Sequence, residues 1–349
     1  MNILCAIVAG SLLSANLFCE DVQPNSISAD AMEMSSETVN ANVALEPNWN
    51  HYSADCARSI GGWMRWWKYL HAKAPFVIDL SYGIRMGIYP RNEECRAIYV
   101  RGTYYPNQLV ALKTLLSKGG VFIDIGANMG YFSVFAAKIV GDKGRVIAIE
   151  PSSREFNRLE HNLKLNRLKN ASAHRLAITD KIGKAKISIA TDERSSLNTI
   201  GYEFSVKGVE KIKTEEVEST TLDNFLKAAR ITKIDLIKLD VEGSEIRALK
   251  GAVKSIKKFH PIIILGTNKD ALNVCDGNLA QLDELIKKLH YVAYYIAKSG
   301  NSFEFKKLDN LSNAPTKTVV CMHENTAPPK LPEFSSKSFV DELLNFFNN

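Results

Sequence analysis

The sequence predicts an α/β fold in which helices cover both faces of a mostly parallel β-sheet. From Phe76 onward, short apolar runs rich in Val and Ile alternate with amphipathic stretches of helical spacing, which is typical of parallel sheets buried on both faces. The last strands follow one another without an intervening helix, which indicates an antiparallel edge. Hydrophobic residues make up 46% and charged residues 23% of the 349 residues. These values exclude a mainly disordered, collagen-like or polytopic membrane protein.

The first 48 residues are expected to lie outside the folded domain. Residues 3–18 are almost wholly apolar but shorter than the ~20 residues that span a bilayer as a helix. Residues 1–19 are therefore interpreted as a signal peptide, with a weak membrane anchor and a disposable leader as open alternatives. Residues 20–48 are rich in Ser, Asn and acids and are expected to form a disordered acidic linker.

Residues 49–116 are expected to form an N-terminal cap of helices and strands. The segment GWMRWWKYL at 62–70 combines four aromatic side chains with two basic ones, and Pro75 ends its helix. We expect this helix to pack its aromatic face on the main domain, while contact with a membrane interface or a sugar stays open. Short strands are expected at 76–80, 87–89 and 97–100, and a helix at 108–116.

Residues 117–325 are expected to form the main domain, followed by a C-terminal tail at 326–349. Ser152 and Glu155 have the spacing of a capping box that opens a helix. The strands of this domain are expected at 121–125, 145–149, 171–178, 185–190, 234–239, 261–265, 291–297 and 316–321. The helices are expected at 131–140, 152–166, 222–229, 243–255 and 279–289, with a further amphipathic stretch at 339–347 in the tail.

Charge and cysteine content restrict the partners only slightly. Residues 49–349 hold all 44 Lys and Arg but 32 of the 38 Asp and Glu, which gives them a net charge of +12. Such a charge favours anionic partners, although a solvated Lys-rich surface is the simpler interpretation. The six cysteines form no CxxC pair and have no His at metal-ligand spacing, so no metal site is expected. One disulfide, such as Cys56 with Cys95, stays open.

A glycine loop follows the first buried strand of the main domain, in the segment VFIDIGANMGYFS at 121–133. Ligands of open α/β sheets bind at the carboxyl ends of strands, and Gly126 and Gly130 let a ligand approach the backbone. The spacing G-x-N-x-G differs from the G-x-G-x-x-G of dinucleotide-binding loops, and Asp124 would repel a phosphate. The loop instead suits a ligand with an ammonium group and a sulfonium, such as S-adenosylmethionine. An ordinary strand-to-helix turn is the alternative.

The next strand, RVIAI, runs into Glu150. An acid at this place in an α/β sheet accepts hydrogen bonds from ribose hydroxyls. Glu150 therefore indicates an adenosine-containing ligand when it is taken together with Asp124. The alternative is that one of the two acids only caps a helix.

A third strand, in IDLIKLDVEGSE, is followed by three carboxylates. Carboxyl groups near a buried site raise each other's pKa, and such a group can act as a general base toward a hydroxyl. We assign this role to Asp240, with Glu242 as the second candidate. Glu245 is expected to pair with Arg247 or Lys250 on a helix surface.

These motifs, in this order, resemble the FkbM family of class I S-adenosylmethionine-dependent methyltransferases over roughly residues 76–292. The resemblance lies in FIDIGANMGYFS, VIAIEPSSREFNRLEHNLKLN, RLAITD, ERSSLN, DLIKLDVEGSEIRALKGA and PIIIL. It implies a Rossmann-like sheet of seven strands, mostly parallel, with an antiparallel last strand and helices on both faces. It also implies O-methylation of a hydroxyl, often on a sugar or a secondary metabolite.

The resemblance further implies a set of cofactor-binding residues spread over four loops. They are Asp124, Gly126, Asn128 and Gly130 for the methionine end, Glu150 for the ribose, Ala177 beside the adenine and Asp240 beside the methyl group. Two positions depart from the family pattern. Tyr105 stands where members typically have the Glu of a Tyr-Glu pair, and Gly266 stands where the PIIIL strand often ends in Glu. Cofactor affinity or acceptor identity is expected to differ accordingly.

Together these features predict an S-adenosylmethionine-dependent O-methyltransferase that acts on a hydroxyl of a carbohydrate, glycolipid or secondary metabolite. The alternative is a catalytically silent binding module of the same fold, tethered at a membrane. Nucleic acid is not an expected partner, because nothing resembles the catalytic loop of base methylation. The N-terminal leader predicts membrane association or export and contact with a membrane surface, with a cytoplasmic location as the alternative.

Overall fold

The computed structural model describes residues 50–52, 62–80, 83–200, 208–275, 277–299 and 302–332. These residues belong to one compact unit that spans 46–349. The predicted leader, the acidic linker and the tail helix at 339–347 lie outside the described residues. Within the described part of the chain, no helix has the length and apolar character needed to cross a membrane.

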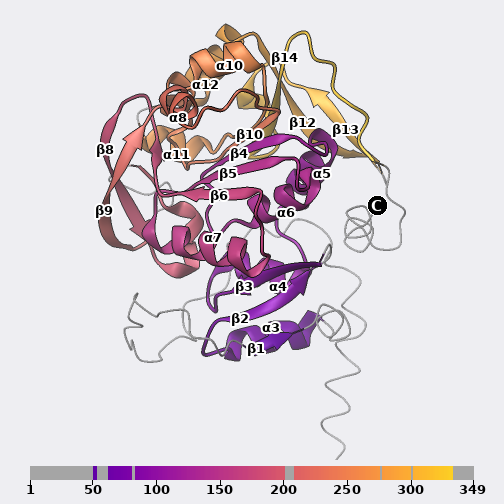
Figure 1. Cartoon of the computed structure of the whole chain (residues 1–349), viewed down its shortest axis with the longest axis vertical. Helices are drawn as coiled ribbons and strands as arrows, with labels where there is room; N and C mark the ends of the chain where they lie inside the picture. The colour runs from indigo at the N-terminus through magenta and orange to yellow at the C-terminus, as the bar shows by residue number, and fades with distance from the viewer. Residues whose placement is uncertain are drawn as a thin grey trace, which may run out of the picture. The chain divides into compact units, whose positions relative to one another are not determined.

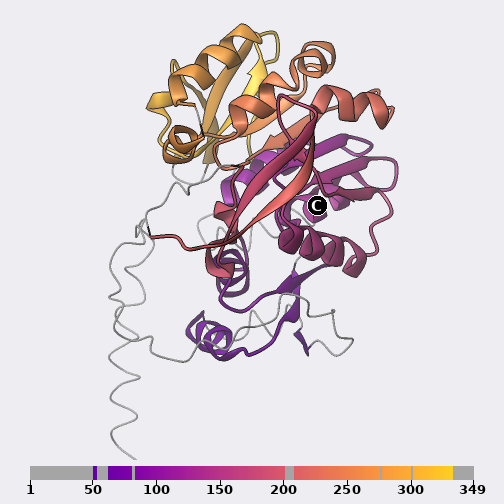
Figure 2. The same cartoon turned by 90° about the vertical axis from the view of Figure 1, so that its left-hand side faces the viewer.

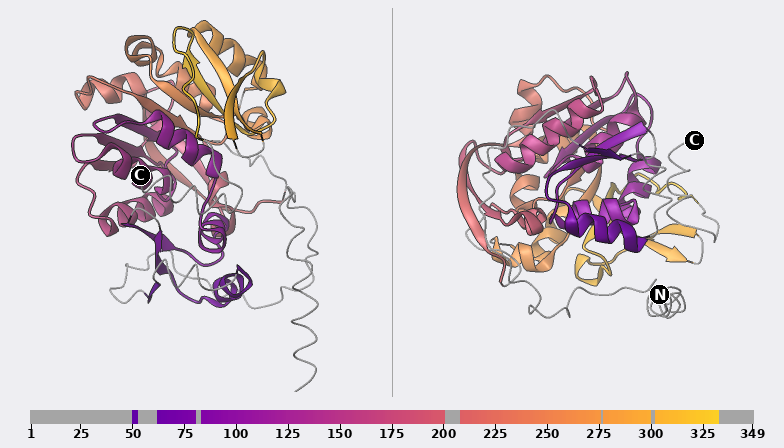
Figure 3. Two further views of the ribbon diagram at one scale, coloured as in Figure 1. Left: turned by 90° about the vertical axis from the view of Figure 1, so that its right-hand side faces the viewer. Right: turned by 90° about the horizontal axis from the view of Figure 1, so that it is seen from below.

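A large mixed sheet forms the centre of the molecule and confirms the predicted fold class (Figure 1). Its strands, in spatial order, are β13 (Ser302–Lys307), β12 (Tyr291–Ser299), β14 (Thr318–His323), β11 (Ile262–Gly266), β10 (Leu236–Leu239), β4 (Val121–Ile125), β5 (Arg145–Ile149) and β6 (Ala171–His174). The five strands from β11 to β6 pair in parallel, whereas the last strand, β14, runs antiparallel between β11 and β12. The sheet has eight strands instead of the expected seven because β13 forms a hairpin with β12 at the edge (Figure 3, left).

Two hydrophobic cores lie on the two faces of this sheet, because successive strand residues point to opposite sides. Phe122 belongs to the first core and Ile123 to the second. The helices that contribute to the first core are α3 (Gly62–His71), α4 (Glu93–Arg101), α5 (Pro106–Leu115), α6 (Tyr131–Val140) and α7 (Ser153–Leu165). The helices that contribute to the second are α8 (Leu222–Ala228), α9 (Glu245–Lys250), α10 (Val253–Phe259), α11 (Lys269–Val274) and α12 (Leu279–Lys288).

The strand register places three strand ends at the same edge of the sheet. Ile125 at the end of β4 pairs with Leu239 at the end of β10 and with Ile149 at the end of β5. The loops that follow these strands carry Asp240 and Glu150. Parallel strands therefore bring Glu150 and Asp240, which are 90 positions apart in the sequence, to one edge.

A three-stranded sheet and helix α3 (Gly62–His71) lie below the central sheet in Figure 1. The strands are β1 (Asn50–Tyr52), β2 (Phe76–Leu80) and β3 (Ile84–Ile88). The expected strand at 97–100 is wrong, because these residues belong to α4. The Asn92 side chain accepts a hydrogen bond from the Cys95 backbone N–H at the start of α4, and Gly102 ends the helix in a left-handed conformation. These two caps favour a helix over the β-branched pattern of the short run. Cys95 itself is a free, buried thiol.

A second small sheet, with the order β7-β9-β8, stands beside the central one (Figure 2). Its strands are β7 (Ala177–Ile178), β8 (Gly183–Ala190) and β9 (Lys211–Thr220), and the 3₁₀ helix η3 (Asp192–Leu197) follows β8. The expected single strand at 171–178 is therefore two strands, β6 and β7, which belong to different sheets. The sequence analysis missed β9, because half of its residues are charged, most of them are exposed, and the segment lacks an apolar alternation.

Two further helix predictions need correction. The expected helix at 243–255 is interrupted between α9 and α10. At this break the backbone of Gly251 packs against Thr179. A Cβ atom on Gly251 would lie 2.0 Å from the Thr179 carbonyl oxygen. The capping box at the start of α7 is also different from expectation, because the Ser152 hydroxyl donates to the Glu155 carboxylate and accepts no hydrogen bond from the N–H groups of the helix.

Candidate active site

The loop between β4 and α6 follows the end of β4 and contacts the carboxyl ends of β5 and β10. The backbone N–H groups of Gly126 and Ala127 donate to the Ile149 carbonyl oxygen at 3.0 and 3.1 Å. Gly126 has a φ of 79°, and a Cβ atom there would lie 1.9 Å from the Asp240 carbonyl oxygen. Glycine is thus required at this position because the backbones of two strand-end loops touch, a reason that the sequence analysis did not foresee.

A pocket opens at this edge of the sheet, between the strand ends and β8 with η3. The predicted site residues that line it are Gly126, Asn128, Glu150, Ala177, Asp240 and Glu242. Asp124 and Gly130 are not part of the lining. Gly130 has a φ of 85° and faces the Leu159 side chain, so it allows α6 to begin close to α7.

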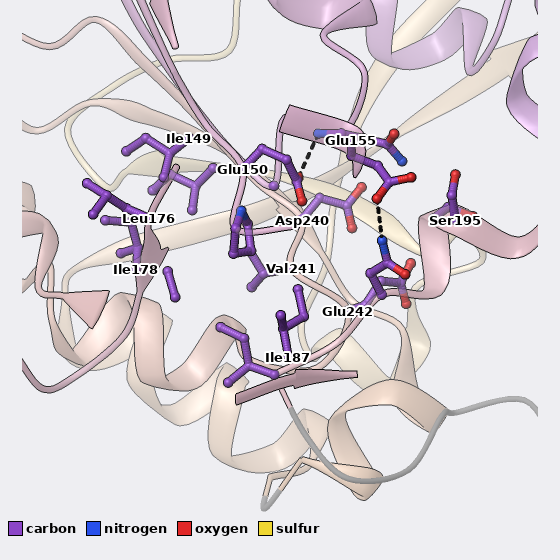
Figure 4. A pocket seen from close by; sticks show the side chains of 18 residues that line it. Ile149, Glu150, Glu155, Leu176, Ile178, Ile187, Ser195, Asp240, Val241 and Glu242 are labelled. Atoms are coloured by element: carbon purple, nitrogen blue, oxygen red, sulfur yellow. Dashed lines mark hydrogen bonds between the residues drawn. The ribbon is translucent and has the colours of Figure 1, made fainter. Parts of the chain in front are cut away.

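Glu150 lies on the polar side of the pocket and is held by two backbone groups. Its Oε2 accepts from the Asn128 N–H and its Oε1 from the Ser152 N–H, both at 2.9 Å. Burial, and then the charge of Glu155, raise the pKa of Glu150 to about 8. Figure 4 shows Ile149, Leu176 and Ile178 on the left of the pocket and Ile187 at the bottom, with the Glu150 and Asp240 carboxylates to the right of the first three. This combination of an apolar wall and a carboxylate can hold a flat ring joined to a hydroxylated group.

Asp240 follows β10 and is held against a buried lysine. Its Oδ2 lies 3.4 Å from Nζ of Lys238, and its side chain is 29% exposed. A Cβ atom on Gly266 would lie 2.6 Å from Oδ1 of Asp240. The absence of a side chain at Gly266 therefore makes room for the Asp240 carboxylate. The arrangement leaves one face of Asp240 open to the pocket.

Asp124 lies beneath the pocket, in the buried layer of the sheet. Its Oδ2 accepts a hydrogen bond of 2.6 Å from the Ser133 hydroxyl, and its Oδ1 lies 4.0 Å from Nζ of Lys238. Burial raises the pKa of Asp124 above its usual value. Burial alone would lower the pKa of Lys238, but the carboxylates of Asp240 and Asp124 raise it. Lys238 thus joins the predicted acids Asp124 and Asp240 in one buried charge cluster.

The two acids after Asp240 have different surroundings. Glu242 adopts a φ of 48°, and its Oε2 accepts 3.0 Å from Nδ2 of Asn268. Burial and the neighbouring charge of Asp240 raise the pKa of Glu242 to about 8. The expected pairing of Glu245 on a helix surface is wrong. Glu245 is buried and accepts 3.0 Å hydrogen bonds from the N–H groups of Val241 and Gly243, because it closes the turn that precedes α9.

Two charged residues near the site were missed from the sequence. Lys238 stands inside an apolar strand, and that polar break in IDLIKL was the available signal. Glu94 lies on α4, in a segment whose sequence did not indicate a functional residue. Its Oε1 accepts from Nδ2 of Asn128 at 3.0 Å and from the Tyr104 hydroxyl at 3.5 Å. Burial, followed by the charge of Glu155, raises the pKa of Glu94 to about 8.

We expect Lys238→Met to lower the free energy of unfolding by about 3 kcal/mol, because it leaves Asp124 buried without its cationic partner. Lys238 and Asp124 are both almost fully buried, so solvent cannot compensate for the loss. Urea unfolding followed by circular dichroism measures the change.

The matched control is Lys233→Met, which removes an exposed lysine that pairs with Asp235 at 2.9 Å. We expect a loss below about 1 kcal/mol for this exposed pair. Equal and small losses in the two variants would contradict a stabilising role of Lys238.

Comparison with known proteins shows similarity to methyltransferases. The model of the Methyltransferase FkbM domain matches residues 124–296. The hexuronic acid methyltransferase AglP of Haloferax volcanii is 24% identical over 199 residues, which cover 55% of this chain and 74% of that protein. Methyltransferase 1 of Beauveria bassiana is 20% identical over 142 residues, which cover 37% of this chain and 57% of that protein. A solved structure of a methyltransferase FkbM from Methylobacillus flagellatus shows 15% identity and a TM-score of 0.37, over 66% of this chain and 55% of that one.

Proposed function

We propose that this chain, which carries an FkbM methyltransferase domain at residues 124–296 and is an S-adenosylmethionine-dependent methyltransferase, methylates a hydroxyl group of a carbohydrate. The observation that carries the proposal is the pocket in which Glu150, Asp240 and Glu242 meet an apolar wall. The printed name of the relative from Haloferax volcanii, a hexuronic acid methyltransferase, supports a sugar as the acceptor.

The residues of the pocket fit S-adenosylmethionine. Each oxygen of Glu150 accepts one backbone hydrogen bond and keeps a lone pair that can accept from a ribose hydroxyl. Leu176 and Ile178 would contact the adenine on the apolar side, next to Ala177. Buried carboxyl groups around the pocket also suit a cation. When bound, the cofactor supplies a methyl group that its sulfonium has already activated.

The residues of this chain would then position the reacting groups and remove the proton of the acceptor hydroxyl. Asp240, held by Lys238 and open to the pocket, would accept the proton of the acceptor hydroxyl. Lys238 and Gly266 fix the position of this carboxylate, since alignment of the reacting groups supplies much of the acceleration. Glu242 remains the second candidate for the same task.

Mass spectrometry of glycans and lipids tests the proposal. Cells with this protein should contain a glycan or glycolipid that is heavier by one methyl group than its counterpart from cells without the protein. A methylated product that contains no sugar would contradict the carbohydrate assignment. Binding of S-adenosylmethionine without turnover on any glycan would instead favour the silent binding module.

The raised pKa of Glu150 predicts a pH dependence of nucleoside binding. An ionised carboxylate accepts stronger hydrogen bonds than a neutral carboxyl group, so a bound ribose lowers the pKa of Glu150 below its free value of about 8. Affinity should therefore rise as the pH increases toward 8 and level off above it. We expect a rise of about tenfold between pH 6.5 and pH 8.5.

The probe for this measurement is 5′-methylthioadenosine, which keeps the ribose but has no amino group that titrates in the same range. Calorimetry at several pH values gives the affinity. Glu150→Gln is the matched control and should bind with a flat profile. A profile of the unmodified protein that is flat or falls with pH would contradict the role of Glu150.

A further inference from the structure

Tyr105 has an unusual conformation at the start of α5. Its φ is 47° and its ψ is 64°, a left-handed backbone that a bulky side chain rarely adopts. Its side chain makes no capping hydrogen bond to the helix, and the residue is 49% exposed. Strained residues of this kind persist where the surrounding structure holds them, and they cluster at functional sites.

The ring of the neighbouring Tyr104 packs against the ring of Tyr105. The two ring centroids lie 4.2 Å apart. The Tyr104 backbone N–H donates to the Tyr131 hydroxyl at 3.2 Å, and the Tyr104 hydroxyl donates to Glu94, which also binds Asn128 of the glycine loop. Tyr105 therefore rests on a buried support that is connected to the pocket.

The position of α5 places Tyr105 at the same sheet edge as Asp240. One turn into α5, Nε2 of Gln108 donates to Oγ1 of Thr318 at 2.9 Å. Thr318 pairs with Gly266, which faces the Asp240 carboxylate. After burial, the charge of Asp240 is among the causes that raise the pKa of Tyr105 to about 12. The hydrogen bonds and the effect of Asp240 on the pKa of Tyr105 both place Tyr105 near Asp240.

We infer that Tyr105 is the platform on which a pyranose ring of the acceptor packs while one of its hydroxyls reaches Asp240. This inference rests on the proposed carbohydrate acceptor. Sugar rings present C–H groups that pack on the electron-rich face of an aromatic ring, and the exposed Tyr105 ring is backed by a second aromatic ring that limits its movement.

Calorimetry of acceptor binding in the presence of S-adenosylhomocysteine tests the inference without methyl transfer. The probes are oligosaccharides of glucuronic acid and cello-oligosaccharides, with the full chain as the protein. Tyr105→Ala should weaken the binding of an oligosaccharide that the unmodified protein binds by about tenfold, and Tyr105→Phe, which keeps the ring, by less than about threefold. Affinity for S-adenosylhomocysteine should stay the same in both variants.

Trp67→Ala is the matched control, since Trp67 on α3 is 50% exposed and belongs to the aromatic segment that also suggested sugar contact. It should leave the affinity unchanged. A loss in Trp67→Ala with none in Tyr105→Ala would overturn the inference and place the sugar at α3. Failure of the unmodified protein to bind any oligosaccharide would overturn the proposed function together with the inference.

Thermal unfolding separates a binding role from a structural one. Tyr105→Gly removes the ring and relieves the left-handed backbone, so its melting temperature should not fall below that of the unmodified protein by more than about 2 °C. Sugar binding should still be lost in this variant. A large drop in melting temperature with unchanged sugar affinity would show that Tyr105 serves only the fold.

Discussion

Asp240→Asn is expected to reduce the rate of methyl transfer by roughly two to four powers of ten, which is the usual contribution of acid–base catalysis. Asparagine keeps the size of the side chain and its place between Lys238 and Gly266, but it cannot take the hydroxyl proton. Cofactor affinity should change much less than the rate. Single-turnover measurements with a saturating cofactor give the rate of the chemical step.

Asp270→Asn is the matched control, because it makes the same chemical change at an exposed position near the start of α11. It should leave the rate unchanged. If Asp240 only orients the cofactor, affinity and rate should fall together. Near-normal turnover of Asp240→Asn would remove this residue from the mechanism and direct attention to Glu242, the second candidate base, which also lines the pocket.

Glu150→Ala is expected to weaken the binding of S-adenosylmethionine by about one to two powers of ten, as the loss of charge-assisted hydrogen bonds would. Asp124→Ala should also weaken it, but less. Asp124 does not line the pocket and acts through Lys238, 4.0 Å away. Calorimetry on the purified protein measures both affinities, and unchanged binding in both variants would contradict the cofactor assignment.

The main features of the fold could be predicted because they depend on periodic burial. The strands β4, β5, β10 and β11 consist mostly of apolar residues, and such strands are typical of parallel sheets covered on both faces. Their parallel register then puts Glu150 and Asp240 at one edge. This part of the site follows from position along the chain together with strand direction.

The remaining parts depend on contacts that no local pattern encodes. Helix α4 is set by the side-chain cap of Asn92 and by Gly102, and a short apolar run there resembles a strand. Glu94 reaches the glycine loop only because α4 packs against the central domain and places it beside Asn128. Gly126 has a further role that the sequence did not indicate, because its backbone approaches the carbonyl group of Asp240, which is far away in the sequence.

Glu245 illustrates the limit of reading charges along a helix. Its spacing to basic residues predicts a surface ion pair, but the turn before α9 leaves the N–H groups of Val241 and Gly243 without helical partners. The Glu245 carboxylate accepts both. Burial, and then the charge of Asp240, raise the pKa of Glu245 to about 7. An acid predicted to lie on the surface is thus a buried part of the loop that carries Asp240.

A crystal structure of the protein with S-adenosylhomocysteine tests the central claim most directly. The account predicts that both ribose hydroxyls donate to the Glu150 carboxylate, with the adenine between Leu176 and Ile178. The sulfur should face Asp240, on the side where the Tyr105 ring is exposed. A ligand bound elsewhere, or bound in this pocket with its ribose away from Glu150, would contradict the account.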